Sequence, residues 1–408
     1  MRILVLSHEN PYPPRGGFNN AIFQTARYLA IENEVDIVSW GANSNQEYIN
    51  ERLRIFHIEE NSLNDISLKS SFGQKNYSKV AERGSLLGLS QLLCTISKGP
   101  SFKSYNKRFG KNYDIILKEG PNGNKIARKL SLSTGIPMVE RLHWIGLPWT
   151  LENYREWYHH LNVQLNMTTL PIRLVKPALD ASLISLQCRR TSTENIITVT
   201  PYDRERVETY FTNSNLTHIY STQPKPEGLN LTRNHDIQTP DYFVFFSSGT
   251  FFTEITLIFL EKLAQHYPKL DFYVVGLNID PSRFRSENVK VLGYLDDTAF
   301  NNVLEKAKGF IFPLIEGHGL QTKLITALGY GKPIIATSAI TMPVPELVNN
   351  EVLLVRDTPR SFIESVNDIV EDDELSNRLS KNSIQVYEKH FSNKSHGRNF
   401  LGYLKRIM

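Results

Sequence analysis

The strongest constraint on the fold is an alternation, along most of the 408 residues, of short apolar runs with segments of helical periodicity. This pattern is typical of parallel sheets whose strands are joined by crossover helices. In the first half, strands are predicted over 2–7, 35–40, 53–58, 113–117, 137–141 and 196–200, and helices over 20–30 and 122–132. In the second half, strands are predicted over 242–246, 271–275, 289–292, 309–312, 333–336 and 352–355, and helices over 254–266, 297–307, 320–329, 361–371, 373–387 and 396–408.

A stretch rich in Pro, Asn and Thr, residues 221–241, separates the two halves and is interpreted as a linker. We therefore expect an α/β protein with two Rossmann-like parallel-sheet domains that face a central cleft. The predicted domains are residues 1–222 and 223–393, with a C-terminal helix over 394–408 that packs back on the first. Ligands of such sheets bind at the carboxyl ends of the strands, so the segments that follow the strands are the candidate sites.

The composition narrows the protein class. Hydrophobic residues make up 40% and charged residues 22% of the chain, which suits a globular protein with large cores, and a net charge of +4 does not indicate a general polycation. The two cysteines, Cys94 and Cys188, are too few for a metal cage or a disulfide framework, and they favour a reduced, cytoplasmic setting. The first residues read as a strand rather than a signal peptide, and no apolar run is long enough to span a membrane.

The segment 309–333 combines the clearest functional signals. A predicted strand is followed by Glu316-Gly317-His318-Gly319, a helix predicted from Leu320, and Lys323 in the first helical turn. Unpaired backbone N–H groups and the positive end of the helix dipole make such a terminus an anion site, and glycines let the backbone approach a ligand. A lysine is unfavourable at an empty helix N-terminus but suits a bound phosphate. The alternative is an ordinary turn from strand to helix.

The first half offers further candidates. Gly16 and Gly17 follow the first strand and could bring the backbone close to a ligand, or they could form a simple turn; Asn19 or Asn20 is a plausible N-cap of the next helix. His143 ends a strand, where it could contact a substrate or make a structural hydrogen bond. Glu119 follows another predicted strand and could act as a base, or be a surface residue.

The segment from Lys69 to Lys111 is basic, with nine Lys or Arg residues against one acid, and carries interleaved aromatic residues. It could contact an anionic membrane or a lipid carrier, or be a solvated loop. No recognised nucleic-acid motif accompanies it, so a nucleic-acid partner is not expected.

In their order along the chain, these motifs resemble the family 4 glycosyltransferases (glycosyl transferases group 1) of the GT-B fold. The resemblance is carried by short segments spread along the chain. In the first half these are RILVL (2–6) with PPRGG (13–17), YDII (113–116), GIP (135–137) with His143, and ITVT (197–200). In the second half they are FYVVG (272–276), VLGY (291–294), Glu316-Gly317-His318-Gly319 with the following helix, GKPIIAT (331–337) and PELV (345–348). The resemblance covers most of the chain, except residues 61–112 and 150–190. It implies a retaining, hexosyltransferase-type enzyme that moves a sugar from a nucleotide-diphosphate sugar to an acceptor hydroxyl, in glycan, glycolipid or polysaccharide synthesis.

The resemblance also implies roles for single residues. Glu316 and His143 would serve at the transferred sugar as catalytic residues, and Lys323 would face the diphosphate. Further substrate contacts would come from Gly16, Gly17, Ser248, Gly249, Thr250, His318, Gly319, Leu320 and Thr326. The partners would be the nucleotide sugar and an acceptor glycan or lipid-linked saccharide, with peripheral contact to the cytoplasmic membrane face through residues 69–111. We expect no cofactor, and no metal, because the chain has no Asp-x-Asp pair.

The sequence departs from the family pattern at two places. Thr326 stands where the family usually has a glutamate that binds the nucleotide ribose. The segment 247–253 has no Lys or Arg, although many members use such residues there to bind the diphosphate. A non-catalytic GT-B binding subunit is therefore the main alternative. A GT-B epimerase would need acidic residues facing the sugar from both domains, for which only Glu119 and Glu316 are candidates. A phosphorylase is disfavoured because no pyridoxal-binding lysine context is found, and a dehydrogenase because no Gly-x-Gly-x-x-Gly follows the first strand.

Overall fold

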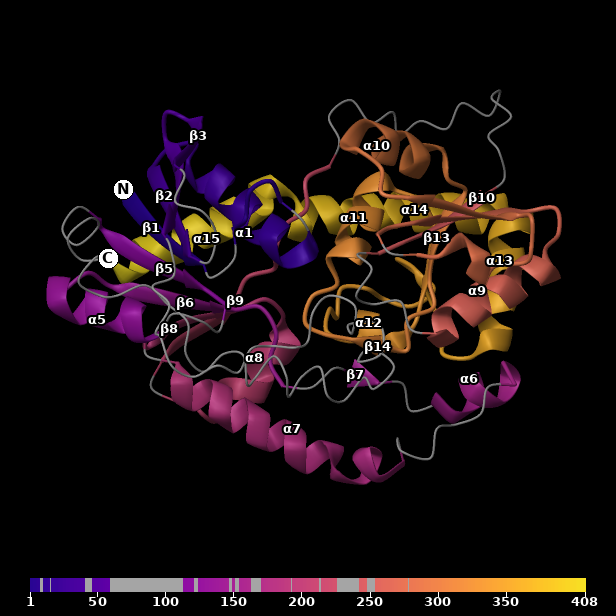
Figure 1. The fold of residues 1–408 in the computed structure, drawn as a ribbon, viewed down its shortest axis with the longest axis horizontal. Helices are drawn as coiled ribbons and strands as arrows, with labels where there is room; N and C mark the ends of the chain where they lie inside the picture. Colours follow the sequence, from indigo (N-terminus) through magenta and orange to yellow (C-terminus); the bar gives the residue numbers. More distant parts are fainter. Residues whose placement is uncertain are drawn as a thin grey trace. The chain divides into compact units, whose positions relative to one another are not determined.

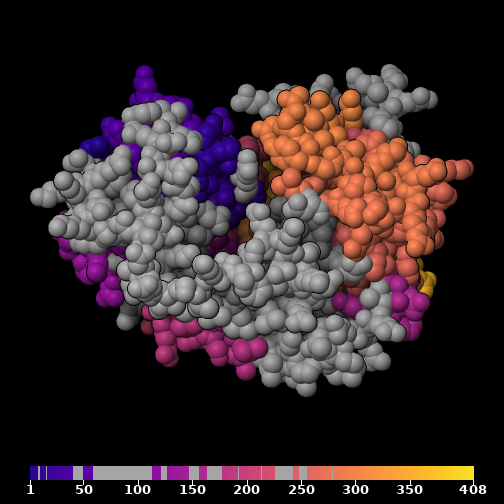
Figure 2. Space-filling view, viewed as in Figure 1, coloured from indigo at the N-terminus to yellow at the C-terminus, as the bar shows by residue number. Residues whose placement is uncertain are grey.

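The computed structural model describes residues 1–7, 10–14, 16–40, 46–58, 113–120, 124–146, 149–150, 154–162, 170–191, 193–212, 214–225, 242–247, 254–277 and 279–408. The chain divides into two compact units (Figure 1). Unit 1 comprises Met1–Leu147, Val175–Thr222 and Asn393–Met408, and unit 2 comprises Pro148–Leu174 and Gln223–Ser392. Described residues of both units appear in colour in the space-filling view, where the orange surface belongs to unit 2 (Figure 2). The predicted basic segment 69–111 lies outside the described residues, as does most of the predicted linker.

Unit 1 contains an eight-stranded sheet with the strand order β3-β4-β2-β1-β5-β6-β8-β9. Neighbouring strands are parallel except for β3 and β4, which form an antiparallel pair. The strands are β1 (Arg2–Ser7), β2 (Glu34–Trp40), β3 (Gln46–Asn50), β4 (Leu53–Ile58), β5 (Ile115–Glu119), β6 (Met138–Leu142), β8 (Asn195–Thr198) and β9 (Asn215–His218). The helices are α1 (Gly16–Leu29), α5 (Asn124–Thr134), α7 (Leu170–Arg190), whose first residues belong to unit 2, α8 (Pro201–Glu208) and α15 (Asn393–Ile407).

The two faces of this sheet are buried by different helices. Alternate residues of β1 point to opposite sides, since side chains along a strand alternate between faces. Ile3 and Val5 pack with α1 and α15, whereas Leu4 and Leu6 pack with α5. Burial on both faces explains why β1 reads as a continuous apolar run rather than an alternating one.

Unit 2 contains a six-stranded, fully parallel sheet with the order β12-β11-β10-β13-β15-β16. Its strands are β10 (Tyr242–Phe246), β11 (Asp271–Val275), β12 (Val289–Gly293), β13 (Gly309–Phe312), β15 (Ile334–Ala336) and β16 (Leu354–Val355). Its helices are α6 (Tyr154–His160), α9 (Glu254–His266), α10 (Asp297–Lys306), α11 (Thr322–Tyr330), α12 (Ser338–Thr341), α13 (Pro359–Glu371) and α14 (Asp373–Val386), with a short 3-10 helix at Pro281–Arg283 and a short π-helix at Tyr387–Phe391.

Residues 148–174 belong to unit 2, although the sequence analysis placed them in the domain 1–222. Two contacts account for this. The short strand β7 (Trp149–Thr150) pairs antiparallel with β14 (Glu316–Gly317). On α6, Trp157 is fully buried, packs edge-on against Phe259 at 4.9 Å and donates a hydrogen bond from Nε1 to the carbonyl oxygen of Asp357 at 2.7 Å.

Several predicted boundaries in unit 1 differ from the structure, and two of these differences bear on candidate residues. Strand β5 runs over 115–119 rather than 113–117, because its pairing with β1 continues to Ser7 and Glu119. Glu119 is therefore the last residue of a strand and not part of a loop. Helix α1 begins at Gly16, so Asn19 and Asn20 lie inside the helix and neither is its N-cap.

Candidate functional site

In unit 2 the candidate site is formed by the connection between β13 and α11. Pro313, Leu314 and Ile315 continue the buried path of β13, and the chain then forms β14 before it turns into the helix. The buried hydroxyl of Thr337 donates a hydrogen bond to the carbonyl oxygen of Leu314 and so ties this connection to the neighbouring strand β15. The site thus lies at the carboxyl edge of the parallel sheet, where ligands of such sheets bind.

Glycines let the backbone pack closely at this connection. A Cβ atom on Gly317 would lie 2.7 Å from the carbonyl oxygen of Ala339, so only glycine allows β14 to approach α12 this closely. Gly319 has φ of +48°, in the left-handed region that favours glycine. Glu316 and His318, on either side of Gly317, are partly exposed, as is Leu320.

The N-terminus of α11 has no side-chain cap. The helix begins at Thr322, two residues later than predicted, and Gln321 occupies the N-cap position without accepting a hydrogen bond from the helix. Its amide instead donates to the carbonyl oxygen of His318 at 2.7 Å. Because the first N–H groups of a helix need acceptors from outside it, this end of α11 suits an anionic ligand.

Lys323 lies in the first turn of α11 and is 9% exposed. Its Nζ atom donates a hydrogen bond to Oγ of Ser247 at 2.8 Å, at the carboxyl end of β10. Burial lowers the pKa of Lys323 to about 7. An anion bound beside Lys323 would raise this pKa again, so ligand binding and protonation of this side chain would be coupled.

Thr326 lies one turn further along α11 and is partly exposed. Its hydroxyl donates to the carbonyl oxygen of Thr322 at 3.1 Å, a hydrogen bond within the helix itself. At the other end of α11, Gly331 has φ of +60° and serves as the C-cap, where a Cβ atom would lie 2.6 Å from Ile384. Ser248, Gly249, Thr250 and Arg15 lie outside the described residues.

In unit 1 the carboxyl edge of the sheet carries a buried charge cluster. Glu119 at the end of β5 and Arg141 on β6 are neighbours in register, and both are fully buried. Oε2 of Glu119 accepts from Nε of Arg141 at 2.9 Å and lies 2.7 Å from Nε2 of His143, whose side chain is 10% exposed. The prediction that Glu119 could be an available base is therefore wrong, since its carboxylate is enclosed and paired.

The pKa values in this cluster follow from burial and charge. Burial alone would raise the pKa of Glu119, but the positive charge of Arg141 and the hydrogen bond from His143 outweigh it and bring this pKa to about 2. Burial lowers the pKa of His143, and the charge of Arg141 lowers it further, against the opposing effect of Glu119. At neutral pH, Glu119 is charged and His143 is neutral.

Helix α15 completes the surroundings of this cluster. The guanidinium of Arg141 lies 5.2 Å from the ring centre of Phe400 and donates to the hydroxyl of Thr25 at 3.0 Å. His396, fully enclosed, lies 3.0 Å from the same hydroxyl and 2.6 Å from the carbonyl oxygen of Tyr220. Burial and the charge of Arg141 lower the pKa of His396 to about 3, so it remains neutral.

Gly16 and Gly17 open α1 at the same carboxyl edge, after β1. Gly16 has φ of +80° and open space where a Cβ atom would lie, so its conformation rather than crowding favours glycine. The next residue, Phe18, packs its ring against His143 at 4.6 Å and nearly perpendicular to it. Sequence reasoning missed Arg141 and Ser247; the signal for Arg141 was a charged residue within a buried strand, which requires a partner.

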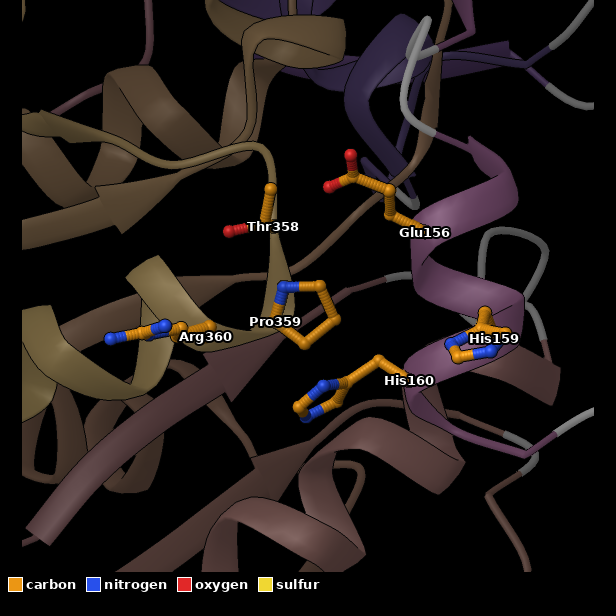
Figure 3. A pocket seen from close by; sticks show the side chains of 6 residues that line it. All are labelled: Glu156, His159, His160, Thr358, Pro359 and Arg360. Atoms are coloured by element: carbon orange, nitrogen blue, oxygen red, sulfur yellow. The ribbon is translucent and has the colours of Figure 1, made fainter.

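A pocket of about 500 Å³ lies elsewhere in unit 2, between α6 and the start of α13 (Figure 3). It is lined by Glu156, His159, His160, Thr358, Pro359 and Arg360 and contains none of the predicted site residues. Within the described residues, no cluster of three or more His, Cys, Asp or Glu side chains could hold a metal ion. None of the described helices combines the length and apolar character that a membrane crossing requires.

Comparisons with solved structures identify the fold. The sucrose-phosphate synthase of Thermosynechococcus elongatus is similar over 100% of this chain and 98% of its own, with a TM-score of 0.68 and 14% identity. HepE of Anabaena, solved with UDP and glucose, is similar over 99% of each chain, with a TM-score of 0.60 and 14% identity. TarM of S. aureus, solved with UDP, fondaparinux and α-GlcNAc-glycerol, covers 98% of this chain and 99% of its own, with a TM-score of 0.60 and 12% identity.

No curated protein sequence matches this chain. Residues 244–372 match the model of the family described as glycosyl transferases group 1, and this range contains Ser247, the β13–α11 connection and Lys323. The match agrees with the resemblance that the sequence motifs predicted, and the two parallel-sheet units agree with the predicted fold class. Residues 244–372 are thus similar to the glycosyl transferases group 1, and the fold of the chain is GT-B.

Proposed function

We propose that this protein is a retaining glycosyltransferase that moves a hexose from a nucleotide-diphosphate sugar to an acceptor hydroxyl. The observation that carries the proposal is the uncapped N-terminus of α11 with the buried Lys323 in its first turn. Both features suit a diphosphate, and both lie inside the range that matches the family.

Lys323 and the helix terminus would act mainly on the leaving group. Negative charge develops on the diphosphate as the bond to the sugar breaks, and donors that are already oriented stabilise that charge most effectively. Lys323 would gain a proton as the donor binds, since its pKa of about 7 would rise beside the diphosphate. HepE and TarM, which share the fold, have been solved with UDP, which supports a nucleotide diphosphate as the ligand.

Glu316, His318 and Gly319 would bind the hydroxyl groups of the transferred sugar from unit 2. Glu316 and His318 are partly exposed on either side of a glycine that lies against α12. His143 in unit 1 would contact a sugar hydroxyl. No protein nucleophile is required in this proposal, because the leaving diphosphate itself would accept the proton of the acceptor hydroxyl.

The acceptor is proposed to be a glycan or a lipid-linked saccharide. TarM was solved with saccharide ligands, which supports a carbohydrate acceptor. Peripheral contact with an anionic membrane through residues 69–111, and a place at the cytoplasmic membrane face, are proposals from the sequence, since these residues lie outside the described part of the chain.

A second function is favoured by one observation. Thr326 occupies the position where the family usually has a ribose-binding glutamate, and its hydroxyl donates to the helix backbone. A GT-B subunit that binds nucleotides without transferring sugar would tolerate this arrangement. The two functions differ in turnover rather than in fold.

The test is a titration of the purified protein with uridine, guanosine, adenosine and thymidine diphosphates, followed by thermal unfolding. A ligand at a hundred times its dissociation constant adds about 2.7 kcal/mol to the free energy of unfolding. We expect one of the four nucleoside diphosphates to stabilise the protein, and Lys323→Ala to abolish that stabilisation. The native protein should then hydrolyse, or transfer the sugar from, nucleotide sugars that carry the same base. Stabilisation without turnover of any sugar would favour the non-catalytic subunit, and no stabilisation by millimolar ligand would contradict the donor site.

A further inference from the structure

The carboxylate of Glu119 makes its two contacts through a single oxygen. Oε2 of Glu119 lies 2.7 Å from Nε2 of His143 and 2.9 Å from Nε of Arg141, and the other oxygen, Oε1, has no hydrogen-bond partner within the described part of the chain. All three side chains belong to unit 1 and come from adjacent strands or the residue that follows them.

The position of the proton follows from the geometry. A carboxylate with a pKa of about 2 carries no proton at neutral pH, so the hydrogen between Glu119 and His143 must belong to Nε2 of the histidine. A neutral imidazole has one N–H, and Nδ1 is then left with a lone pair. His143 is thus presented as a hydrogen-bond acceptor at Nδ1, while the ring of Phe18 packs against it and restricts its orientation.

Burial and the charge of Arg141 together keep the imidazole neutral. A buried carboxylate alone would favour the imidazolium, because opposite charges stabilise each other. Arg141 supplies that opposite charge directly, and its own charge lowers the pKa of His143. The three side chains together carry no net charge when His143 is neutral.

We propose that Glu119 is a positioning residue that fixes the tautomer of His143 in which Nδ1 accepts a hydrogen bond from a sugar hydroxyl, while burial and the charge of Arg141 keep the imidazole neutral. The identity of the bound group rests on the function proposed above, whereas the protonation of His143 does not. The arrangement selects a neutral hydrogen-bond donor over an anion, because a lone pair repels negative charge.

Other charged groups near His143 are already paired. Lys118 and Glu140 lie on the same two strands one residue before Glu119 and Arg141, so they point to the opposite face of the sheet. They form their own buried ion pair at 2.7 Å. On the side of α15, the enclosed His396 is neutral. The Nε2 proton of His143 is therefore shared with Glu119 and with none of these groups.

The test is the protonation state of His143, read from long-range proton–nitrogen correlation spectra of the full chain with labelled histidine and assigned with His143→Asn. We expect a protonated Nε2 and a bare Nδ1 at pH 7.5. In Glu119→Gln the amide can either accept or donate, and we expect both tautomers to be populated. Because Glu119→Gln leaves Arg141 buried without its counter-ion and could fail to fold, the double variant Glu119→Leu/Arg141→Met removes the whole pair.

The matched control is Glu140→Gln, which disrupts a similarly buried ion pair at the neighbouring position of the same strands. We expect it to lower stability without changing the tautomer of His143. If the proposed transfer activity is found, Glu119→Gln should lower kcat/KM by about tenfold, the loss of one well-oriented hydrogen bond. Glu119→Gln should also shift the acidic limb of the pH profile of kcat/KM, whereas Glu140→Gln should leave that limb unchanged.

A protonated Nδ1 in the native protein would overturn the proposal. It would also be overturned if the double variant kept the native tautomer, or if Glu140→Gln altered the tautomer as much as the Glu119 variants do. Failure to find sugar transfer would remove the proposed ligand group but leave the spectra as a separate test of the positioning role.

Discussion

The carboxyl edges of the two parallel sheets are built from opposite kinds of interaction. In unit 1, buried cations lie against carboxylates, as Arg141 does against Glu119 and Lys118 against Glu140. In unit 2, the buried Lys323 donates to the neutral hydroxyl of Ser247 beside an uncapped helix terminus. Both sheets are built mainly of parallel strands joined through helices, so the difference lies in the side chains at their edges and not in the kind of sheet.

This difference suggests a division of roles. A cation that already has a carboxylate contact gains little from an external anion, because that anion would have to compete with the carboxylate. Lys323, whose pKa burial lowers to about 7, would gain both a proton and a favourable interaction when a diphosphate binds. We infer that unit 2 is the anion-binding unit and that unit 1 provides neutral polar contacts.

The largest expected effect is that of Lys323→Met. Removal of a preorganised positive group from a developing charge costs about 10²–10³ in kcat, and we expect a loss of this size together with loss of diphosphate binding. The variant should unfold less readily at pH 7.5, by up to about 4 kcal/mol, because the unfolded chain takes up a proton on lysine that the folded chain does not.

The pH dependence of the free energy of unfolding is the control for this prediction. The folded pKa of about 7 lies below the ordinary 10.5, so the native protein should lose stability as the pH falls from 10.5 to 7. Lys323→Met should remove that dependence. Equal activity of variant and native protein would contradict the role of Lys323, whatever the stability change.

A smaller effect should appear in the pH dependence of diphosphate binding. Between pH 7.5 and 9, Lys323 is mostly neutral before the ligand binds. Binding then requires proton uptake, so the affinity should fall by about tenfold per pH unit. Calorimetry in two buffers of different ionisation enthalpy would measure the protons taken up. Lys323→Arg keeps its charge throughout this window and should bind with an affinity that does not vary with pH; proton uptake in that variant would show that another group titrates.

In unit 1, two glycines of α15 allow a test of how closely this helix packs against α1 beside the charge cluster. A Cβ atom on Gly397 would lie 1.7 Å from the ring of Tyr28, whereas one on Gly402 would meet nothing within 4 Å. We expect Gly397→Ala to lower the free energy of unfolding by about 1–3 kcal/mol through overpacking. Gly402→Ala should raise it by about 0.5–1 kcal/mol through helix propensity. Denaturant titration of both variants would measure the contrast, and equal values would contradict the close packing of α15 on α1.

The sequence was sufficient for the repeating core of each sheet, because buried parallel strands are continuous apolar runs; β1, β10 and β11 have the predicted bounds. The sequence was less informative about elements whose formation depends on tertiary contacts. Strand β9 and helix α6 carry no strong periodicity, and α6 is held by the burial of Trp157. At the candidate site, Lys323 could be placed in a first turn, but its contact with Ser247 joins residues 76 positions apart, and no local pattern predicts it.

The smallest expected effect is that of Thr326→Glu, which bears on how complete the anion-binding edge of unit 2 is. A carboxylate at this partly exposed position could accept hydrogen bonds from ribose hydroxyls, and charge-assisted bonds are stronger than neutral ones by roughly 1 kcal/mol. We expect the nucleoside diphosphate identified above to bind about five- to tenfold more tightly, as measured by calorimetry. The 2′,3′-dideoxy nucleotide is the control, since it lacks the hydroxyls and should gain no affinity.

Tighter binding of both nucleotides would mean that the substitution stabilises α11 generally, because Glu is a better helix former than Thr. Weaker binding of both would mean that the carboxylate repels the diphosphate beside Lys323, in which case Thr326 is suited to this site and its departure from the family pattern does not indicate lost activity.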